Sequence, residues 1–237
     1  MIDKMSQKID KRPFPNTVEK YFLQDKNCND RIYAYLLLQS KFNPNGRETH
    51  RYVEKMSNLQ IAADLKLNKN TVGTRMKDLK SRGYVVQEGK YYLVPKPDYY
   101  TLIPKDTLDF LLYYLGDKDK IIKLYIVMWD YWVRQQNFTM LDLHRELGYT
   151  LKDNKPQTRN SIHIRELLTL LRGASLIDYE IVSGRNEKGA PIDLYKIKWV
   201  RSNLPDMFKE SYKRLVETGE ITPEWEEIIT SDRKSVV

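Results

Sequence analysis

The sequence predicts a mainly helical α+β chain that contains two copies of one small domain. Three pairs of segments repeat along the chain in the same order. Residues 21–33 recur as 113–125, with Tyr-Phe-Leu matched by Tyr-Tyr-Leu and Asp-Lys matched by Asp-Lys. Residues 59–65 (LQIAADL) match 141–147 (LDLHREL), and residues 76–85 match 168–177 in the spacing of their apolar side chains. Self-similarity of this kind is typical of a duplicated structural unit.

The first copy is predicted to begin with three helices. An apolar stretch over 31–42 is long enough for a buried first helix. Ser57 is a suitable N-cap for a short helix over 58–65, because its hydroxyl can accept hydrogen bonds from the open N–H groups of the first turn. After a short turn, either Asn68 or Asn70 caps the third helix.

The third helix is expected to run to about Arg82 and to end at Gly83, which permits a left-handed residue. Strands over 84–86 and 91–94 then flank a tight turn that contains Gly89. The string IAADLKLNKNTVGTRMKDLKSRGYV within this unit resembles the core of the winged helix-turn-helix family. The resemblance implies that the hairpin is the wing and that the third helix enters the major groove of DNA.

Helical periodicity separates the two sides of this third helix. Val72, Met76 and Leu79 fall on one side and are expected to face the core. The opposite side is small, polar and basic, and residues 68–82 hold five Lys or Arg against one Asp. Asn can bind adenine, Lys can reach guanine acceptors and Thr can contact a thymine methyl group. The alternative to DNA binding is that this lysine-rich face is simply solvated.

We therefore predict that the first copy is the main DNA reader. Its predicted contact residues are Asn68, Lys69, Asn70, Thr71, Thr74, Arg75, Lys77 and Ser81 on the helix, with Lys90 and Tyr91 at the hairpin tip.

The second copy is predicted to have the same architecture. Its first helix covers 118–137, and Thr139 caps a short helix over 140–147 that Gly148 ends. A polar loop over 149–157 follows, and Thr158 or Asn160 opens a helix that ends at Gly173. The predicted strands, 176–182 and 192–200, flank a longer and more basic hairpin loop, 183–190.

The chemistry of the second copy differs from that of the first. The outward side of its third helix carries Ile162, Glu166 and Thr169, which suit base reading poorly. Two roles remain open for this copy: contact with the DNA backbone, or association into a homodimer. The residues predicted to contact the backbone are Thr158, Arg159, Arg165, Arg185 and Lys188.

The predicted division of the chain is a basic arm over 1–16, domain 1 over 17–97, domain 2 over 98–200 and a helical acidic tail over 201–237. The arm is either a flexible basic arm or a frayed end. An amphipathic helix over 104–116 opens domain 2 and has its counterpart in 17–24. Residues 215–232 hold six Asp or Glu and no Lys or Arg. This block either binds a protein partner or packs on a basic face of its own chain.

Composition agrees with a polyanion as the partner. The chain has 237 residues, room for two domains of ~100 residues each, and its formal charge is +8 with a pI near 9.3. It has no apolar run long enough to span a membrane and no secretory signal pattern. The one cysteine, Cys28, allows no internal disulfide and no cysteine zinc site. A cytoplasmic setting is expected.

We do not expect an enzyme, a metal or a cofactor. His50, His144 and His163 have no metal-binding spacing, and no phosphate-binding glycine loop or Gly-x-Ser-x-Gly motif is present. The architecture is similar to that of plasmid or phage replication initiators built of two winged helices and to that of small bacterial or phage transcription regulators. The lack of a recognisable sensor domain and the unequal chemistry of the two copies favour replication initiation or control for a plasmid, phage or mobile element. A transcription regulator without a sensor domain is the alternative, and a winged helix that binds only proteins is the second alternative.

Overall fold

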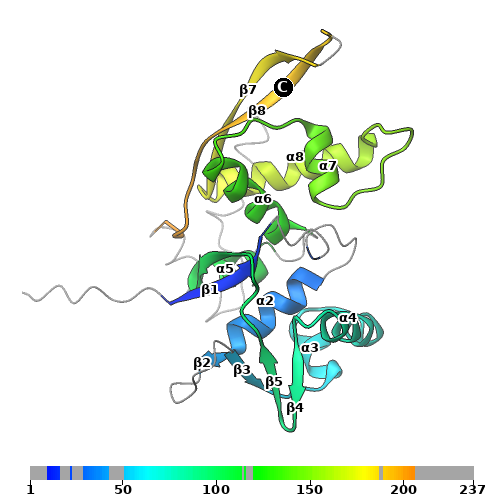
Figure 1. Cartoon of the computed structure of the whole chain (residues 1–237), viewed down its shortest axis with the longest axis vertical. Coiled ribbons are helices and arrows are strands. Elements are labelled where there is room, and N and C mark those ends of the chain that lie inside the picture. The colour runs from blue at the N-terminus through cyan, green and yellow to red at the C-terminus, as the bar shows by residue number, and fades with distance from the viewer. Residues whose placement is uncertain are drawn as a thin grey trace, which may run out of the picture.

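The computed structural model describes residues 10–16, 22, 29–42, 51–113, 115, 120–186 and 189–205. These residues form seven helices and three small antiparallel sheets, shown in Figure 1. The predicted α+β class is confirmed at this level. Within these ranges, none of the helices combines the length and the apolar character needed to cross a membrane.

The first copy follows the order helix, strands, two helices and hairpin. Its elements are α2 (Asn29–Gln39), β2 (Lys41–Phe42), β3 (Arg51–Glu54), α3 (Asn58–Asp64), α4 (Lys69–Ser81), β4 (Val86–Glu88) and β5 (Tyr91–Val94). The sheet order is β2-β3-β5-β4, with Val53 opposite Tyr92. The first helix was predicted to continue to residue 42, but it ends at Gln39. At this end of the helix, the Ser40 hydroxyl donates to the Leu37 carbonyl oxygen over 2.7 Å and so satisfies one of the last open carbonyl groups.

The predicted caps of α3 and α4 are present. The Ser57 Oγ accepts a hydrogen bond from the Gln60 N–H at 3.1 Å. Of the two alternatives for α4, Asn68 is the cap, because its Oδ1 accepts from the Asn70 N–H at 2.8 Å. Gly83 has φ of 77° and follows the C-cap residue Arg82, which is the position where a left-handed glycine ends a helix.

The second copy repeats this order. Its elements are α6 (Ile121–Val133), α7 (Met140–Glu146), α8 (Thr158–Gly173), β7 (Ile177–Arg185) and β8 (Pro191–Val200). Phe138 pairs with Tyr195 as an isolated bridge, in the position that β3 occupies in the first copy. The α6 helix is shorter than the predicted 118–137. The N-cap of α8 is Gln157, not Thr158 or Asn160, and β7 reaches Arg185, so the hairpin loop is shorter than expected.

A third sheet corrects the prediction for the N-terminal arm. Strand β1 (Lys11–Pro15) pairs antiparallel with β6 (Tyr100–Pro104), which leads directly into α5 (Lys105–Tyr113). The end of the arm is therefore neither flexible nor frayed, and Arg12, one of the basic residues of the predicted arm, is buried. The predicted helix over 17–24 lies outside the described residues except for Phe22. The acidic stretch 215–232 also lies outside them.

The buried apolar side chains of both copies form one connected cluster that runs from Phe14 to Leu204. At its N-terminal end, the rings of Phe14, Phe22 and Tyr33 meet edge to face, with centroids 5.2 to 5.7 Å apart. Edge-to-face aromatic pairs of this spacing are favourable beyond the area they bury. Strand β1 is therefore attached to α2 by its side chains as well as to β6 by its backbone.

Replacing Thr139 with Ala should lower the free energy of unfolding. Thr139 and Asp142 form a reciprocal capping box at α7, in which the Thr139 Oγ1 accepts from the Asp142 N–H at 3.2 Å and Asp142 accepts from the Thr139 N–H at 2.8 Å. Loss of such a cap costs about 0.5–2 kcal/mol. Urea denaturation measures the change, and Thr150→Ala in the following loop is the matched control. Equal stability of the two variants would contradict the role of the box.

Candidate nucleic-acid interface

Helix α4 divides its side chains as predicted. Val72, Met76 and Leu79 are buried in the core. Asn70, Thr74, Lys77 and Ser81 are exposed, and Lys69 is exposed beside them. The helix therefore presents a polar row to solvent, backed by the hydrophobic core.

The charges on this row are not neutralised by the described part of the chain. Asp78, the one acid of the helix, pairs with Arg82 over 3.0 Å. Lys69 and Lys77 form no ion pair with any described residue. Among the described residues, their ammonium groups therefore have no carboxylate partner, which leaves them able to contact phosphate or a base edge.

Several neighbouring candidates already have a structural task. Asn68 caps the helix, and the Ser81 hydroxyl donates to the Asp78 carbonyl oxygen over 2.9 Å. Thr71 and Arg75 are only half exposed. The residues best placed to contact a ligand are therefore Lys69, Asn70, Thr74 and Lys77, and we call them the α4 row.

Lys80 joins α4 to the hairpin, a role that the sequence did not indicate. Its Nζ donates to the Gln87 Oε1 over 2.8 Å and lies 4.9 Å from the centre of the Tyr92 ring. Burial, and then the charge of Lys55, lower its pKa. This lysine fixes the hairpin against the helix and is less available for DNA.

The hairpin tip carries the other two candidates of the first copy. Lys90 is exposed, and its carbonyl oxygen accepts from the Lys55 N–H over 2.8 Å. Tyr91 is also exposed and meets Tyr52 edge to face, with centroids 5.7 Å apart. The hairpin tip is thus exposed to a possible ligand, but the Tyr91 ring already packs against Tyr52 on the outer face of the sheet.

In the second copy, Thr158, Arg159 and Arg165 are exposed along α8. Arg159 lines an open cavity of about 480 Å³ together with Asn160, Ile162, His163 and Glu166. Arg185 donates to the Gly189 carbonyl oxygen at 3.4 Å in the hairpin loop. Lys188 lies outside the described residues.

Other basic groups of the second copy are paired internally. Arg172 meets Asp178 at 3.0 Å, and Lys198 meets the same carboxylate at 3.9 Å. Lys196 pairs with Glu180 at 3.4 Å. The second hairpin therefore carries mixed charge near its base, whereas the α4 row carries only positive charge.

The two helix pairs lie on one side of the molecule. In Figure 1, α3 with α4 and α7 with α8 lie on the same side of the long axis, while the two hairpins, β4–β5 and β7–β8, point to opposite ends. The two hairpins, which carry the predicted contacts outside the helices, therefore lie at opposite ends of the molecule.

The sequence places His144 on a helix with Leu, Arg and Glu, which predicts a side chain at the surface or facing phosphate, and this prediction is wrong. The ring is fully buried between α7 and α8, where its Nε2 lies 3.0 Å from the Ser161 Oγ. The Ser161 Oγ also donates to the Gln157 carbonyl oxygen at 3.3 Å, an arrangement in which the imidazole donates through Nε2. Its Nδ1 is buried without a partner. In the described residues, no group of three or more potential ligands could hold a metal ion.

Comparison of the chain with protein-family models, with curated proteins and with solved structures finds no match.

The stability of the protein should fall as the pH is lowered through about 6.5 because of His144. Burial lowers the pKa of this imidazole, so the unfolded chain takes up the proton first, and stability is lost from the ordinary pKa of histidine down to the lower folded value. His144→Gln should flatten this part of the stability curve, measured by urea denaturation at successive pH values. An identical pH slope with and without His144 would contradict the assignment.

Ile162→Ser should weaken self-association if the second copy is a dimer surface. Ile162 lies on the outward side of α8 and is 50% exposed, and burying such a side chain contributes about 1.5–3 kcal/mol. Sedimentation velocity measures the monomer–dimer equilibrium, with Arg165→Ala as a control on the same helix. An unchanged profile for Ile162→Ser would remove this role and leave the backbone-contact alternative.

Proposed function

We propose that this protein binds double-stranded DNA in a sequence-specific manner through α4. The observation that carries the proposal is the α4 row, whose lysines have no partner among the described residues. A surface row of only positive and small polar groups, on a helix fixed by its core side, suits the major groove.

The order of elements supports a winged-helix reading of both copies. In the first copy, α2, β3, α3, α4 and the β4–β5 hairpin follow one another. In the second copy, α6, the Phe138–Tyr195 bridge, α7, α8 and the β7–β8 hairpin correspond to them. On this reading α4 and α8 are the two recognition helices, and the hairpins are the wings.

Each residue of the α4 row has a chemically defined role in this proposal. Asn70 can bind adenine through two hydrogen bonds, and Lys77 can reach the O6 and N7 acceptors of guanine. Thr74 can contact a thymine methyl group. Lys69, at the start of the helix, and Lys90, at the hairpin tip, contact phosphates, which position the protein and make its affinity depend on salt.

The second copy contributes less to base reading in this proposal. Arg159 and Arg165 on α8, and Arg185 in the hairpin, are exposed and suit contact with the backbone. The exposed Ile162 favours association of two chains instead. We further propose that the protein serves replication initiation or control of a plasmid, phage or mobile element, with transcription regulation without a sensor domain as the alternative. Catalysis is not part of the proposal.

One observation favours a protein-interaction module as a second candidate. The outer face of the first sheet exposes Val86 and Tyr91 and also carries Glu54 and Glu88, which lie opposite Tyr91 in the register. Carboxylates flanking an aromatic ring repel phosphate, so this face suits a protein better than DNA.

Lys77→Ala should reduce specific binding by about 1–3 kcal/mol if Lys77 contacts a base edge. The target site is first obtained by selecting bound duplexes from a random pool near physiological salt. Fluorescence anisotropy then compares this site with random DNA, on which the loss should be smaller. Lys41→Ala is the control, because it also removes one positive charge but lies on β2, at the edge of the sheet opposite to the hairpin strand β4.

Equal losses on both kinds of DNA would reduce Lys77 to a phosphate contact. If no motif is enriched and binding depends only on salt, sequence-specific recognition is excluded and the protein-interaction candidate takes its place.

A further inference from the structure

Helix α8 carries a row of three side chains on the side that faces away from the core. At about 100° per residue, Arg159, Ile162 and Glu166 fall together on one side of the helix. The opposite side is the buried one, formed by Ser161, Ile164, Leu167, Leu168 and Leu171. We call Arg159, Ile162 and Glu166 the α8 row. The core fixes the helix from behind, and the row faces outward.

The α8 row is open to contact from outside. Arg159 is exposed, Ile162 is 50% exposed and the Glu166 side chain is 61% exposed. Together with Asn160 and His163, these residues line the open cavity of about 480 Å³. A branched apolar side chain therefore stands beside an open hollow, with a cation on one side of it along the helix and an anion on the other.

The charges of the α8 row are incompletely paired within the described part of the chain. Arg159 forms no ion pair with any residue that the structure describes. Glu166 has only His163, whose Nδ1 lies 3.8 Å from its Oε2, and this contact is ionic only when the imidazole is protonated. Both ends of the row can thus accept a partner of opposite charge.

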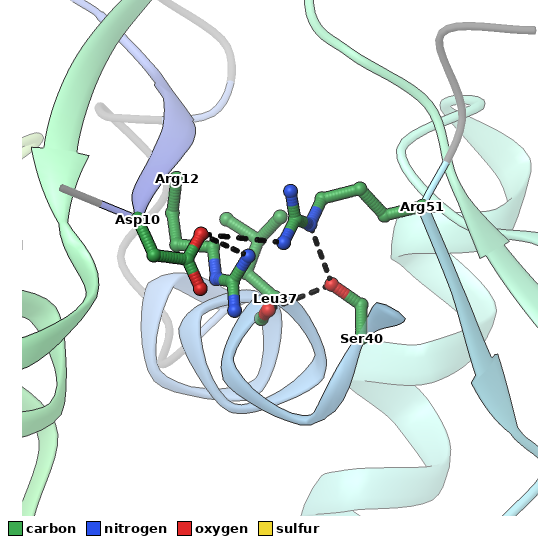
Figure 2. Close-up of polar contacts among 5 residues, drawn as sticks. All are labelled: Asp10, Arg12, Leu37, Ser40 and Arg51. Carbon is green, nitrogen blue, oxygen red and sulfur yellow. Dashed lines mark hydrogen bonds and ion pairs between the residues drawn. The ribbon is translucent and has the colours of Figure 1, made fainter. Parts of the chain in front are cut away.

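An arginine cluster in the first copy shows the contrasting case, in which the chain supplies its own carboxylate. The Arg12 Nη1 lies 2.9 Å and the Arg51 Nη2 3.7 Å from the same Asp10 Oδ1, and the Arg51 Nε donates to the Ser40 Oγ over 3.0 Å (Figure 2). These two arginine side chains are only 4% and 13% exposed. They therefore connect parts of one chain, whereas Arg159 is free to contact another molecule.

The spacing of the α8 row makes it complementary to itself. Arg159 and Glu166 lie two helical turns apart, about 10.5 Å along the axis, and Ile162 lies near the midpoint. A two-fold axis through this midpoint generates a second helix that runs antiparallel. Each Arg159 then lies level with the partner's Glu166, so the same ion pair forms twice, as in any contact between identical surfaces.

Apolar burial and charge have separate tasks in such a contact. Ile162 lies level with the partner's His163, at the hollow that the row lines, so two isoleucines are removed from water at the centre. The charges select the direction of the helices. A parallel pair would set Arg159 against its own copy and Glu166 against its own copy, and facing like charges are unfavourable.

We propose that α8 is the contact between two copies of this chain, packed antiparallel so that Arg159 of each binds Glu166 of the other across the paired Ile162 side chains. This inference gives a geometry to the homodimer alternative for the second copy, and it does not depend on DNA binding by α4. A single pair of helices buries less surface than a standard interface, so the dimer is weak and depends on concentration.

Exchange of the two charges tests the proposal on the full chain without DNA. Sedimentation velocity over a concentration series measures association of the wild type, of Arg159→Glu and of Glu166→Arg. Each variant alone sets like charges against each other twice, so its dissociation constant should rise by about tenfold or more. Mixed in equal amounts, the two variants should associate with each other, because both contacts of the mixed dimer then join opposite charges.

A matched control separates the contact from a general effect of charge. Lys152→Glu makes the same change of charge as Arg159→Glu, in the exposed loop before α8, and should associate as the wild type does. Recovery in the mixture also shows that both variants are folded. A wild type that stays monomeric throughout the series would overturn the proposal, as would undiminished association of both single variants. Failure of two folded variants, checked by circular dichroism, to associate in the mixture would overturn the antiparallel arrangement.

Discussion

The shared packing of α2, α5 and α6 is the constraint on which the rest of the structure depends. These three helices contact one another, and they join the first helix of each copy through the helix between them. The junction also buries charge. Burial raises the pKa of Asp30 on α2, and the charges of Lys123 and Lys120 in the second copy oppose part of this rise. The attraction of these two lysines for the Asp30 carboxylate thus links the first helix of one copy to that of the other, in addition to the packing of the helices.

The two copies show how one backbone plan can support different surfaces. Both have a short capped helix, a long helix and a hairpin. In the first copy, Asp78 pairs with Arg82, and Lys69 and Lys77 lie exposed on the same helix. In the second, Asp178 and Glu180 bind the neighbouring cations Arg172, Lys196 and Lys198. The difference lies in where a few carboxylates are placed, and it makes α4 the better candidate for binding a polyanion.

Local signals in the sequence predicted much of the fold, and non-local pairing limited the rest. The caps Ser57, Asn68 and Thr139 act within one helical turn, so their residue types suffice to identify them. Strand β3 has only four residues, and its partner β5 lies far along the chain, so no local pattern indicates it. Arg12 and His144 are buried by elements that lie elsewhere in the sequence, so their burial could not be predicted from local patterns either. Helical periodicity alone predicted that the α4 row faces away from the core. Only the structure shows that its lysines form no ion pair with a described carboxylate.

The pairing of β1 with β6 has a consequence for how the protein folds. Lys11 lies opposite Pro104, so roughly 90 residues must be synthesised and ordered before the strand finds its partner, and closing a loop of that length carries an entropic cost. The β7–β8 hairpin pairs residues close in sequence and can form quickly. During synthesis β1 therefore leaves the ribosome well before its partner β6, and the Arg12 guanidinium group remains hydrated until the two strands pair.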